Sequence, residues 1–194
     1  MHTIEPYYSW QHIYQASEDE LSPFYQREYS EFVFSDKIYN YYIHPQWDYI
    51  ESPTLYLKIL IADYINEFAV IELFGEWNDA VNNDIMFLKN NVLDKLKING
   101  INQFILIAEN VLNFHASDDC YYEELHEDLS ATNGWLVLLN LRPHIIEEMQ
   151  TINLNRFVLF GEHLNEYNWR ANDKPEFLFE QIKNLFEHDY QLIE

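Results

Sequence analysis

The sequence is poor in the residues that mark several common classes of protein. Cysteine occurs once and glycine four times in 194 residues. A single cysteine cannot form an internal disulfide, and its use suits a reducing compartment, so we expect a cytoplasmic protein. The glycines stand singly, as in LFGEW and INGIN, so the chain has neither a Gly-x-Gly-x-x-Gly fingerprint nor a Walker loop for phosphates.

Basic residues are also scarce, which excludes a second group of functions. Eleven lysines and arginines face 33 aspartates and glutamates, for a formal net charge of −22 at pH 7. No basic stripe is available to neutralise phosphates, so we expect neither nucleic-acid binding nor attachment to an anionic membrane. Apolar runs such as ILIA and WLVLL are too short to cross a bilayer, and the N-terminus does not have the pattern of a signal peptide. The charge itself either serves solubility or attracts a basic protein partner.

Aromatic residues, in contrast, are abundant, at 17 % of the chain, within a hydrophobic content of 48 %. This is enough apolar surface for one good core. Tyrosine and tryptophan cluster near the N-terminus, in PYYSW and YNYYIHPQWDY. We predict an aromatic N-terminal extension at residues 1–52, an α/β domain at 53–165, and a C-terminal helix packed on that domain at 166–194. The extension either packs on the domain or presents an interaction surface, since such residues are enriched in interfaces.

From Thr54 onward the apolar pattern alternates between the periods of strands and helices. Strand-like runs occur at 54–62, 68–75, 103–112 and 135–141, with a short further candidate at 156–161. Amphipathic helical patterns occur at 77–100, 118–134, 142–155 and 174–190. This order predicts an α/β fold with a four- to five-stranded mixed sheet and helices mainly on one face.

Between about residues 68 and 160 this order resembles the STAS domain, the fold of anti-sigma-factor antagonists and of sulfate-transporter regulatory tails. The likeness lies in three segments: VIELFGEWNDAVNNDIMFLKNNVLDKL, FILIAENVLNFHASDDCYYEEL and NGWLVLLNLRPHIIEEMQTINLNRFVLF. The resemblance implies a non-enzymatic regulatory protein that docks another protein, with an anti-sigma kinase-like partner.

The resemblance also aligns HASD, residues 115–118, with the family's Asp-Ser-Ser-Gly motif. Ser117 then takes the place of the serine that a partner kinase phosphorylates in bacterial antagonists, and His115 and Asp118 replace the flanking residues. The residues themselves predict Ser117 as the N-cap of the following helix, with Asp118 and Asp119 in its first turn. These aspartates would repel a phosphate dianion, and we hypothesise that their permanent charge mimics a phosphorylated state.

The predicted docking surface is the acidic segment, which we define as residues 114–130. Its acids would steer a basic partner during association, an effect that salt weakens. The residues that we expect to contact the partner are His115, Asp118, Asp119, Glu123, Glu124 and Glu127.

Other chemistry in the acidic segment is not supported by its spacing. A zinc site normally needs paired ligands, whereas His115, Cys120 and His126 include one cysteine and no close pair. Acidic neighbours disfavour a Cys120 thiolate, so we predict a small apolar core residue there rather than a nucleophile. No Gly-x-Ser-x-Gly elbow occurs. We therefore predict no catalytic residue, no metal, no cofactor and no enzymatic activity.

Two alternatives remain open. The protein is either a small-molecule sensor or unrecognised enzyme, with a pocket between the aromatic extension and the sheet, or a structural subunit that dimerises through residues 38–49. The oligomeric state does not follow from the sequence.

Overall fold

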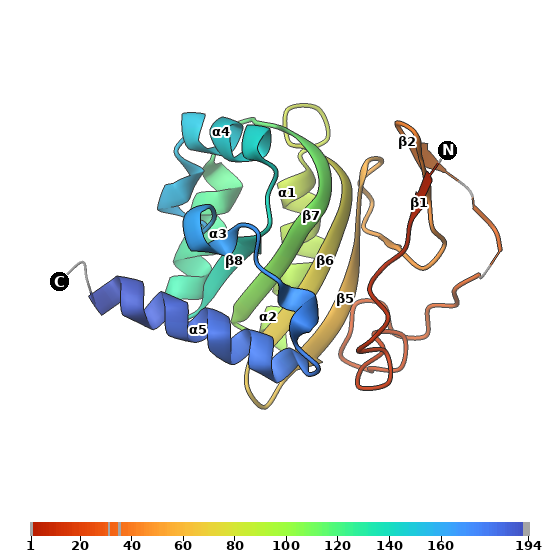
Figure 1. The fold of residues 1–194 in the computed structure, drawn as a ribbon, viewed down its shortest axis with the longest axis horizontal. Helices are drawn as coiled ribbons and strands as arrows, with labels where there is room; N and C mark the ends of the chain where they lie inside the picture. The colour runs from red at the N-terminus through yellow and green to blue at the C-terminus, as the bar shows by residue number, and fades with distance from the viewer. Residues whose placement is uncertain (1, 31, 35, 192–194) are drawn as a thin grey trace.

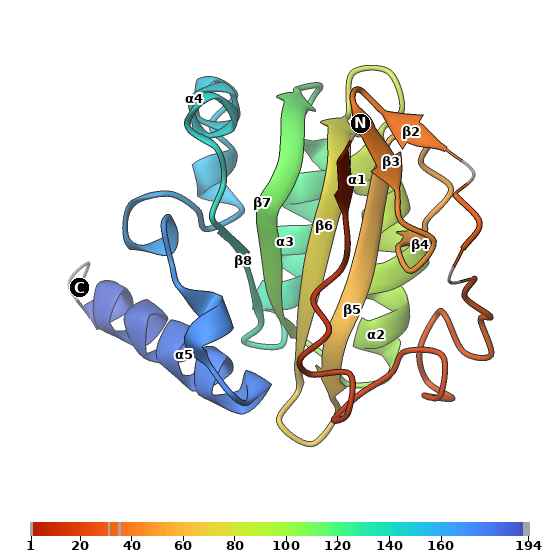
Figure 2. The same cartoon turned by 45° about the vertical axis from the view of Figure 1, so that its right-hand side comes forward.

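The computed structural model describes residues 2–30, 32–34 and 36–191, and its centre is a five-stranded mixed sheet (Figures 1 and 2). The strand order is β4-β5-β6-β7-β8. β5 is antiparallel to β4 and β6, while β7 is parallel to β6 and β8. The predicted α/β fold is confirmed. The strands are β4 (Asp48–Tyr49), β5 (Leu55–Asp63), β6 (Phe68–Asn78), β7 (Gln103–His115) and β8 (Trp135–Leu139).

The central strand β6 is almost entirely apolar over its first eight residues, with Glu72 as the exception, because both faces of the sheet are covered. Its first eight residues, FAVIELFG, are all buried, as expected of a strand between two layers. β7 runs to His115, beyond the predicted end at 112, because it stays paired with β6 as far as Asn78 opposite His115. The end of β7 therefore carries the start of the acidic segment.

Most helices lie on one face of this sheet (Figure 2). The first is continuous, with a π-helical middle: α1 (Asp84–Leu88), η1 (Lys89–Leu93) and α2 (Asp94–Ile98). α3 (Cys120–Ser130) and α4 (Pro143–Thr151) complete the layer. Their apolar side chains share one buried cluster with residues such as Leu57, Ile71 and Leu106 of the strands.

The first helix starts seven residues later than predicted, at Asp84 instead of residue 77. Residues 77 and 78 extend β6, and a turn follows in which Val81 is 80 % exposed. Carboxylates hold this turn: Asp84 Oδ2 accepts a hydrogen bond from the Asn78 amide at 2.7 Å, and Asp79 Oδ1 accepts one from the Ile85 amide at 2.8 Å. These bonds satisfy backbone groups without a helix.

The opposite face is covered by segments from both ends of the chain. α5 (Pro175–Gln191) contributes Leu178, Phe179 and Ile182 to a second buried cluster, which also contains Trp10 and Trp169. Short 3-10 turns precede α5: η2 (Leu154–Arg156), η3 (Glu162–Leu164) and η4 (Trp169–Ala171). The candidate strand at 156–161 is reduced to one bridge between Val137 and Leu159.

Part of the aromatic extension forms a small sheet of order β1-β3-β2 beside β5 and β6 (Figure 1). Trp47 of the extension stacks on Phe74 of β6 with ring centroids 5.3 Å apart. The division into segments 1–52, 53–165 and 166–194 stays a prediction, and residues 1, 31, 35 and 192–194 of it lie outside the described residues. The small strands are β1 (His2–Ile4), β2 (Lys37–Ile38) and β3 (Tyr41–Ile43).

Candidate functional site

The acidic segment begins at the carboxyl end of β7, where three parts of the chain meet. His115 Nε2 lies 3.0 Å from Glu76 Oε1, and the Tyr39 hydroxyl donates to Glu76 Oε2 at 2.7 Å. Tyr39 belongs to the turn between β2 and β3, so these contacts join the aromatic extension to the ends of β6 and β7. His115 is half-buried at this joint.

Ser117 is not the N-cap of the helix that follows. α3 begins at Cys120 with Asp119 in the N-cap position, and Ser117 lies exposed in the loop before it. Asp118 Oδ1 accepts a hydrogen bond from the Cys120 amide at 3.2 Å. This local bond from a carboxylate to the backbone two residues on favours a turn, and the helix therefore starts two residues later than predicted.

The acids of α3 divide between the solvent and the neighbouring helix. Glu124 lies 2.9 Å from Lys89 Nζ, which also contacts Asp94 at 3.0 Å and Asp128 at 3.7 Å. Burial alone would lower the pKa of Lys89, but its hydrogen bonds with Glu124 and Asp94 outweigh this and raise the pKa. Glu124 thus ties α3 to η1, although its side chain is 57 % exposed and it shares Lys89 with Asp94 and Asp128.

Glu123 and Glu127 make no such contact with the neighbouring helix. Both are exposed and lie one turn apart on α3, so their side chains share one face. Asp118 is also exposed, while Asp119 is half-buried. Within the described part of the chain, neither Glu123 nor Glu127 forms an ion pair.

An exposed apolar side chain lies at the same end of the sheet. The turn that carries Val81 is bound to the end of β7, because the amides of Asp79 and Ala80 donate to the His115 carbonyl at 2.9 and 3.2 Å. Both views place this turn and the end of β7 together (Figures 1 and 2). We call the exposed residues Val81, Ser117, Asp118, Glu123 and Glu127 the docking corner.

Comparisons with known proteins give structural matches only. No family model matches the sequence, and no curated protein matches it significantly. The anti-sigma factor antagonist SpoIIAA in its unphosphorylated form is 15 % identical with a TM-score of 0.43, over 66 % of this chain and 97 % of that one. The phosphorylated form of SpoIIAA, a Bacillus cell fate determinant, is 18 % identical with a TM-score of 0.38, over 56 % and 92 % of the two chains. A proposed anti-sigma factor antagonist from Thermotoga maritima is 16 % identical with a TM-score of 0.39, over 59 % and 87 %.

These solved structures belong to the same group of proteins that the STAS resemblance suggests. With TM-scores below 0.5, no role is transferred from them to this chain. Membership of the STAS family stays a prediction, and the function below rests on the geometry of the chain itself.

Cys120 is exposed and is not the core residue that the sequence predicts. It occupies the first turn of α3, on the solvent side of the helix. A hydrogen bond with Asp118, together with the charges of Asp118, Asp119 and Glu123, raises the pKa of the thiol. An exposed thiol with a raised pKa is a poor nucleophile near neutral pH.

We expect a disulfide reagent to modify Cys120 more slowly than it modifies free cysteine at neutral pH. Asp118→Asn removes the charge that disfavours the thiolate and should accelerate modification several-fold. Labelling rates with a chromogenic disulfide measure this, with Glu180→Gln as the control. Equal rates in the wild type and in Asp118→Asn would contradict the effect of Asp118.

A buried acid beneath the docking corner was not predicted from the sequence. Asp79 is 4 % exposed, and its carboxylate accepts hydrogen bonds from the Tyr122 hydroxyl at 2.6 Å and from Trp77 Nε1 at 3.1 Å. Burial raises the pKa of Asp79 to about 6, although these donors oppose the shift. Asp79 therefore fixes α3 against the end of β6. Its partner Tyr122 is distant in sequence, so no local pattern signals this contact.

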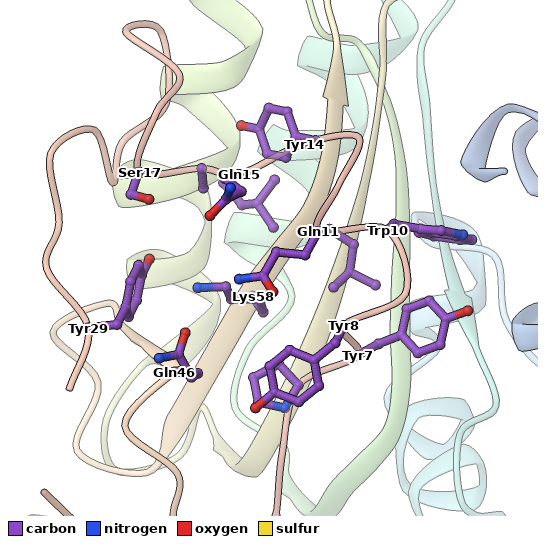
Figure 3. Close-up of a pocket in the computed structure, with 14 residues that line it drawn as sticks. Tyr7, Tyr8, Trp10, Gln11, Tyr14, Gln15, Ser17, Tyr29, Gln46 and Lys58 are labelled. Atoms are coloured by element: carbon purple, nitrogen blue, oxygen red, sulfur yellow. The ribbon is translucent and has the colours of Figure 1, made fainter. Parts of the chain in front are cut away.

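The pocket expected between the aromatic extension and the sheet is present but small (Figure 3). Its volume is about 40 Å³, and its walls include Gln11, Gln15 and Gln46 of the extension and Lys58 of β5. A space of this size has room for a few water molecules at most, whereas small-molecule sites normally measure at least about 300 Å³. The small-molecule alternative gains no support from this pocket.

Two further findings concern the described residues as a whole. None of their helices combines the length and the apolar character that crossing a membrane requires. No group of three or more His, Cys, Asp or Glu side chains among them is placed to hold a metal ion.

Proposed function

We propose that this protein is a non-enzymatic regulatory protein that binds a protein partner through the docking corner. The observation that carries the proposal is the exposure of Val81 at the end of the sheet where the acidic segment begins. Asp118, Glu123 and Glu127 of that segment are exposed and form no ion pair within the described chain. Interfaces commonly combine an apolar contact with a charged rim. Here Val81 supplies the apolar contact, and Asp118, Glu123 and Glu127 supply the rim.

The partner in this proposal presents a basic surface with an apolar recess. The exposed acids and the net charge of −22 favour such a surface over an acidic one. Glu124 belongs to the Lys89 contacts and takes a structural role, so we assign the steering charge to Asp118, Glu123 and Glu127. His115 contacts Glu76 at the base of the loop that carries Ser117, and Asp119 occupies the N-cap position of α3.

We include regulation through Ser117 in the proposal because HASD resembles the phosphorylation motif of the antagonists. Its exposure leaves the hydroxyl accessible to a kinase-like partner. The charges of Asp118 and Asp119 beside it make the unmodified loop resemble a phosphorylated one. The switch is then held permanently in one state, and adding a phosphate has less effect than in an unsubstituted motif.

We expect the combined variant Asp118→Asn, Glu123→Gln, Glu127→Gln to lose most of the partner that the native protein retains. The experiment is a pull-down from lysate of the source cells, with mass spectrometry of the retained proteins and of Ser117. The matched control neutralises three exposed acids elsewhere, Glu18, Glu20 and Glu180. A partner lost equally from both variants depends on overall charge, which would contradict the docking corner.

The kinetics with the identified partner provide a second criterion. Steering by exposed charges predicts an association rate that falls by about tenfold or more between low and physiological salt. The rate of the triple variant should fall much less, while Val81→Ser should mainly raise the dissociation rate. An association rate that does not change with ionic strength would remove the role given to the three acids.

A further inference from the structure

A second cavity, larger than the one in Figure 3, lies between the two ends of the chain. Its walls come from residues 7–13 of the aromatic extension and residues 170–176 before and at the start of α5, and its volume is about 710 Å³. This is within the range of about 300–1,000 Å³ that is typical of small-molecule sites. It is distinct from the docking corner, and nothing in the proposed function uses it.

The two walls are held together by contacts within the chain. Trp10 Nε1 donates to the Asn172 carbonyl at 3.2 Å, and the Tyr7 ring packs edge-on against Trp169 with centroids 4.7 Å apart. The Tyr7 amide also donates to Glu72 of β6 at 2.8 Å. These contacts fix the cavity in place before any ligand arrives, which lowers the entropic cost of binding.

Two of the eleven lysines and arginines line this cavity. The Arg170 side chain is 47 % exposed, and its Nη2 contacts Glu109 and lies 3.8 Å from Glu72 Oε1. Its guanidinium stacks on Trp169 at 4.5 Å. The described ion pairs use Nη2 only, which leaves other donors of this planar group for a carboxylate. Lys174 is exposed and has no ion pair among the described residues.

The same cavity contains an acid with an unused acceptor. Glu176 lines it, and Glu176 Oε2 is buried without a hydrogen-bond donor among the described residues. Oε2 itself is closed to solvent, but Glu176 as a whole is only half-buried and borders the cavity, so its carboxylate offers a counter-charge to a ligand ammonium group. Tyr7 and Ile13 add apolar surface to the walls.

We propose that this cavity binds a small zwitterion of the amino-acid class. Arg170 and Lys174 take its carboxylate, Glu176 takes its ammonium group, and Tyr7 and Ile13 contact an apolar side chain. The pairing of signs excludes simpler ligands: a plain anion would face Glu176 and Asp173, and a plain cation would face Arg170 and Lys174. The zwitterion is the ligand that satisfies both sets.

The test begins with ligand-observed NMR of the full chain against the common amino acids at millimolar concentration. The best binder is then compared by calorimetry with its two half-charged analogues; for L-leucine these are L-leucinamide, which lacks the carboxylate, and 4-methylpentanoate, which lacks the ammonium group. Each missing charge-assisted hydrogen bond should weaken binding by about ten- to a hundredfold. The variants Lys174→Met and Glu176→Gln should weaken binding of the amino acid by similar factors.

Matched controls separate a local effect from one of net charge or folding. Lys95→Met on α2 and Glu180→Gln, one turn further along α5, make the same charge changes on exposed side chains outside the cavity. Both should bind like the wild type. The proposal is overturned if no amino acid binds, if an analogue binds as tightly as the zwitterion, or if the controls weaken binding as much as the cavity variants.

Discussion

Between about pH 4.5 and pH 7, the free energy of unfolding should fall by about 3 kcal/mol, because Glu72 ionises in the unfolded chain while it keeps its proton in the folded chain. Glu72 lies in the middle of β6 with no exposed surface. Burial raises its pKa to about 7 from the ordinary value of 4.5, although the Tyr7 amide, Arg170 and Asn110 oppose the shift. A shift of this size corresponds to a few kcal/mol between the two protonation states.

The direction follows from which state binds the proton. Below about pH 4.5 Glu72 is protonated in both the folded and the unfolded chain, so its contribution does not change with pH. Between the unfolded pKa and the folded pKa of about 7, the folded chain keeps a proton that the unfolded chain has lost. Rising pH therefore favours unfolding in this window, and the loss is complete once Glu72 also ionises in the folded state. Asp79, with a pKa raised to about 6, acts in the same direction.

Urea unfolding followed by tryptophan fluorescence across this pH range measures the effect. Glu72→Gln keeps the size of the side chain and removes the ionisation, so about 3 kcal/mol of the pH dependence should disappear. The exposed Glu180→Gln changes the net charge equally and should leave the dependence intact. If both variants retain the slope of the wild type, the slope reflects the overall negative charge and not Glu72.

The sheet and the layer of helices could be predicted because their apolar residues recur at regular spacing. Runs such as FAVIELFG and WLVLL are buried on both sides and mark strands by composition alone. The errors occur where side-chain contacts override periodicity. Val81 has the spacing of a helical core residue, yet it is exposed because the carboxylates of Asp79 and Asp84 stabilise a turn there. Cys120 is exposed because Asp118 shifts the helix start.

The candidate sites likewise could be predicted only where their residues are close in sequence. The spacing of Glu123 and Glu127 predicts a shared helix face, but it cannot reveal that Glu124 meets Lys89, which is far away in sequence. The cavity between residues 7–13 and 170–176 could not be predicted from the sequence, because only folding brings these two segments together. No sequence pattern links Glu176 to Arg170 in advance, because both roles depend on the walls that Trp10 and Trp169 hold in place.

A buried charge where the extension meets the sheet should give the second large effect, with Asp48→Asn costing about 3 kcal/mol of stability. Asp48 has no exposed surface. It lies 3.2 Å from Arg27 Nε and 3.5 Å from Lys58 Nζ, and it accepts a hydrogen bond from the Tyr29 hydroxyl at 2.6 Å. Burial raises the pKa of Asp48, and Lys58, Tyr29 and Arg27 only partly offset it. Burying these charges costs desolvation free energy, which their mutual attraction offsets. Removing the carboxylate leaves the mostly buried Lys58 without a counter-ion.

A graded set of variants distinguishes the loss of this counter-ion from the loss of one hydrogen bond. Tyr29→Phe removes only the hydroxyl and should cost about 1 kcal/mol. The double variant Asp48→Asn, Lys58→Met removes both charges and should recover a large part of the stability lost in Asp48→Asn, because no unpaired ammonium remains at the site. Urea unfolding at constant pH gives all three values. A double variant less stable than Asp48→Asn would mean that Lys58 contributes through its position over the Tyr29 ring, 3.6 Å from the centroid, rather than through Asp48.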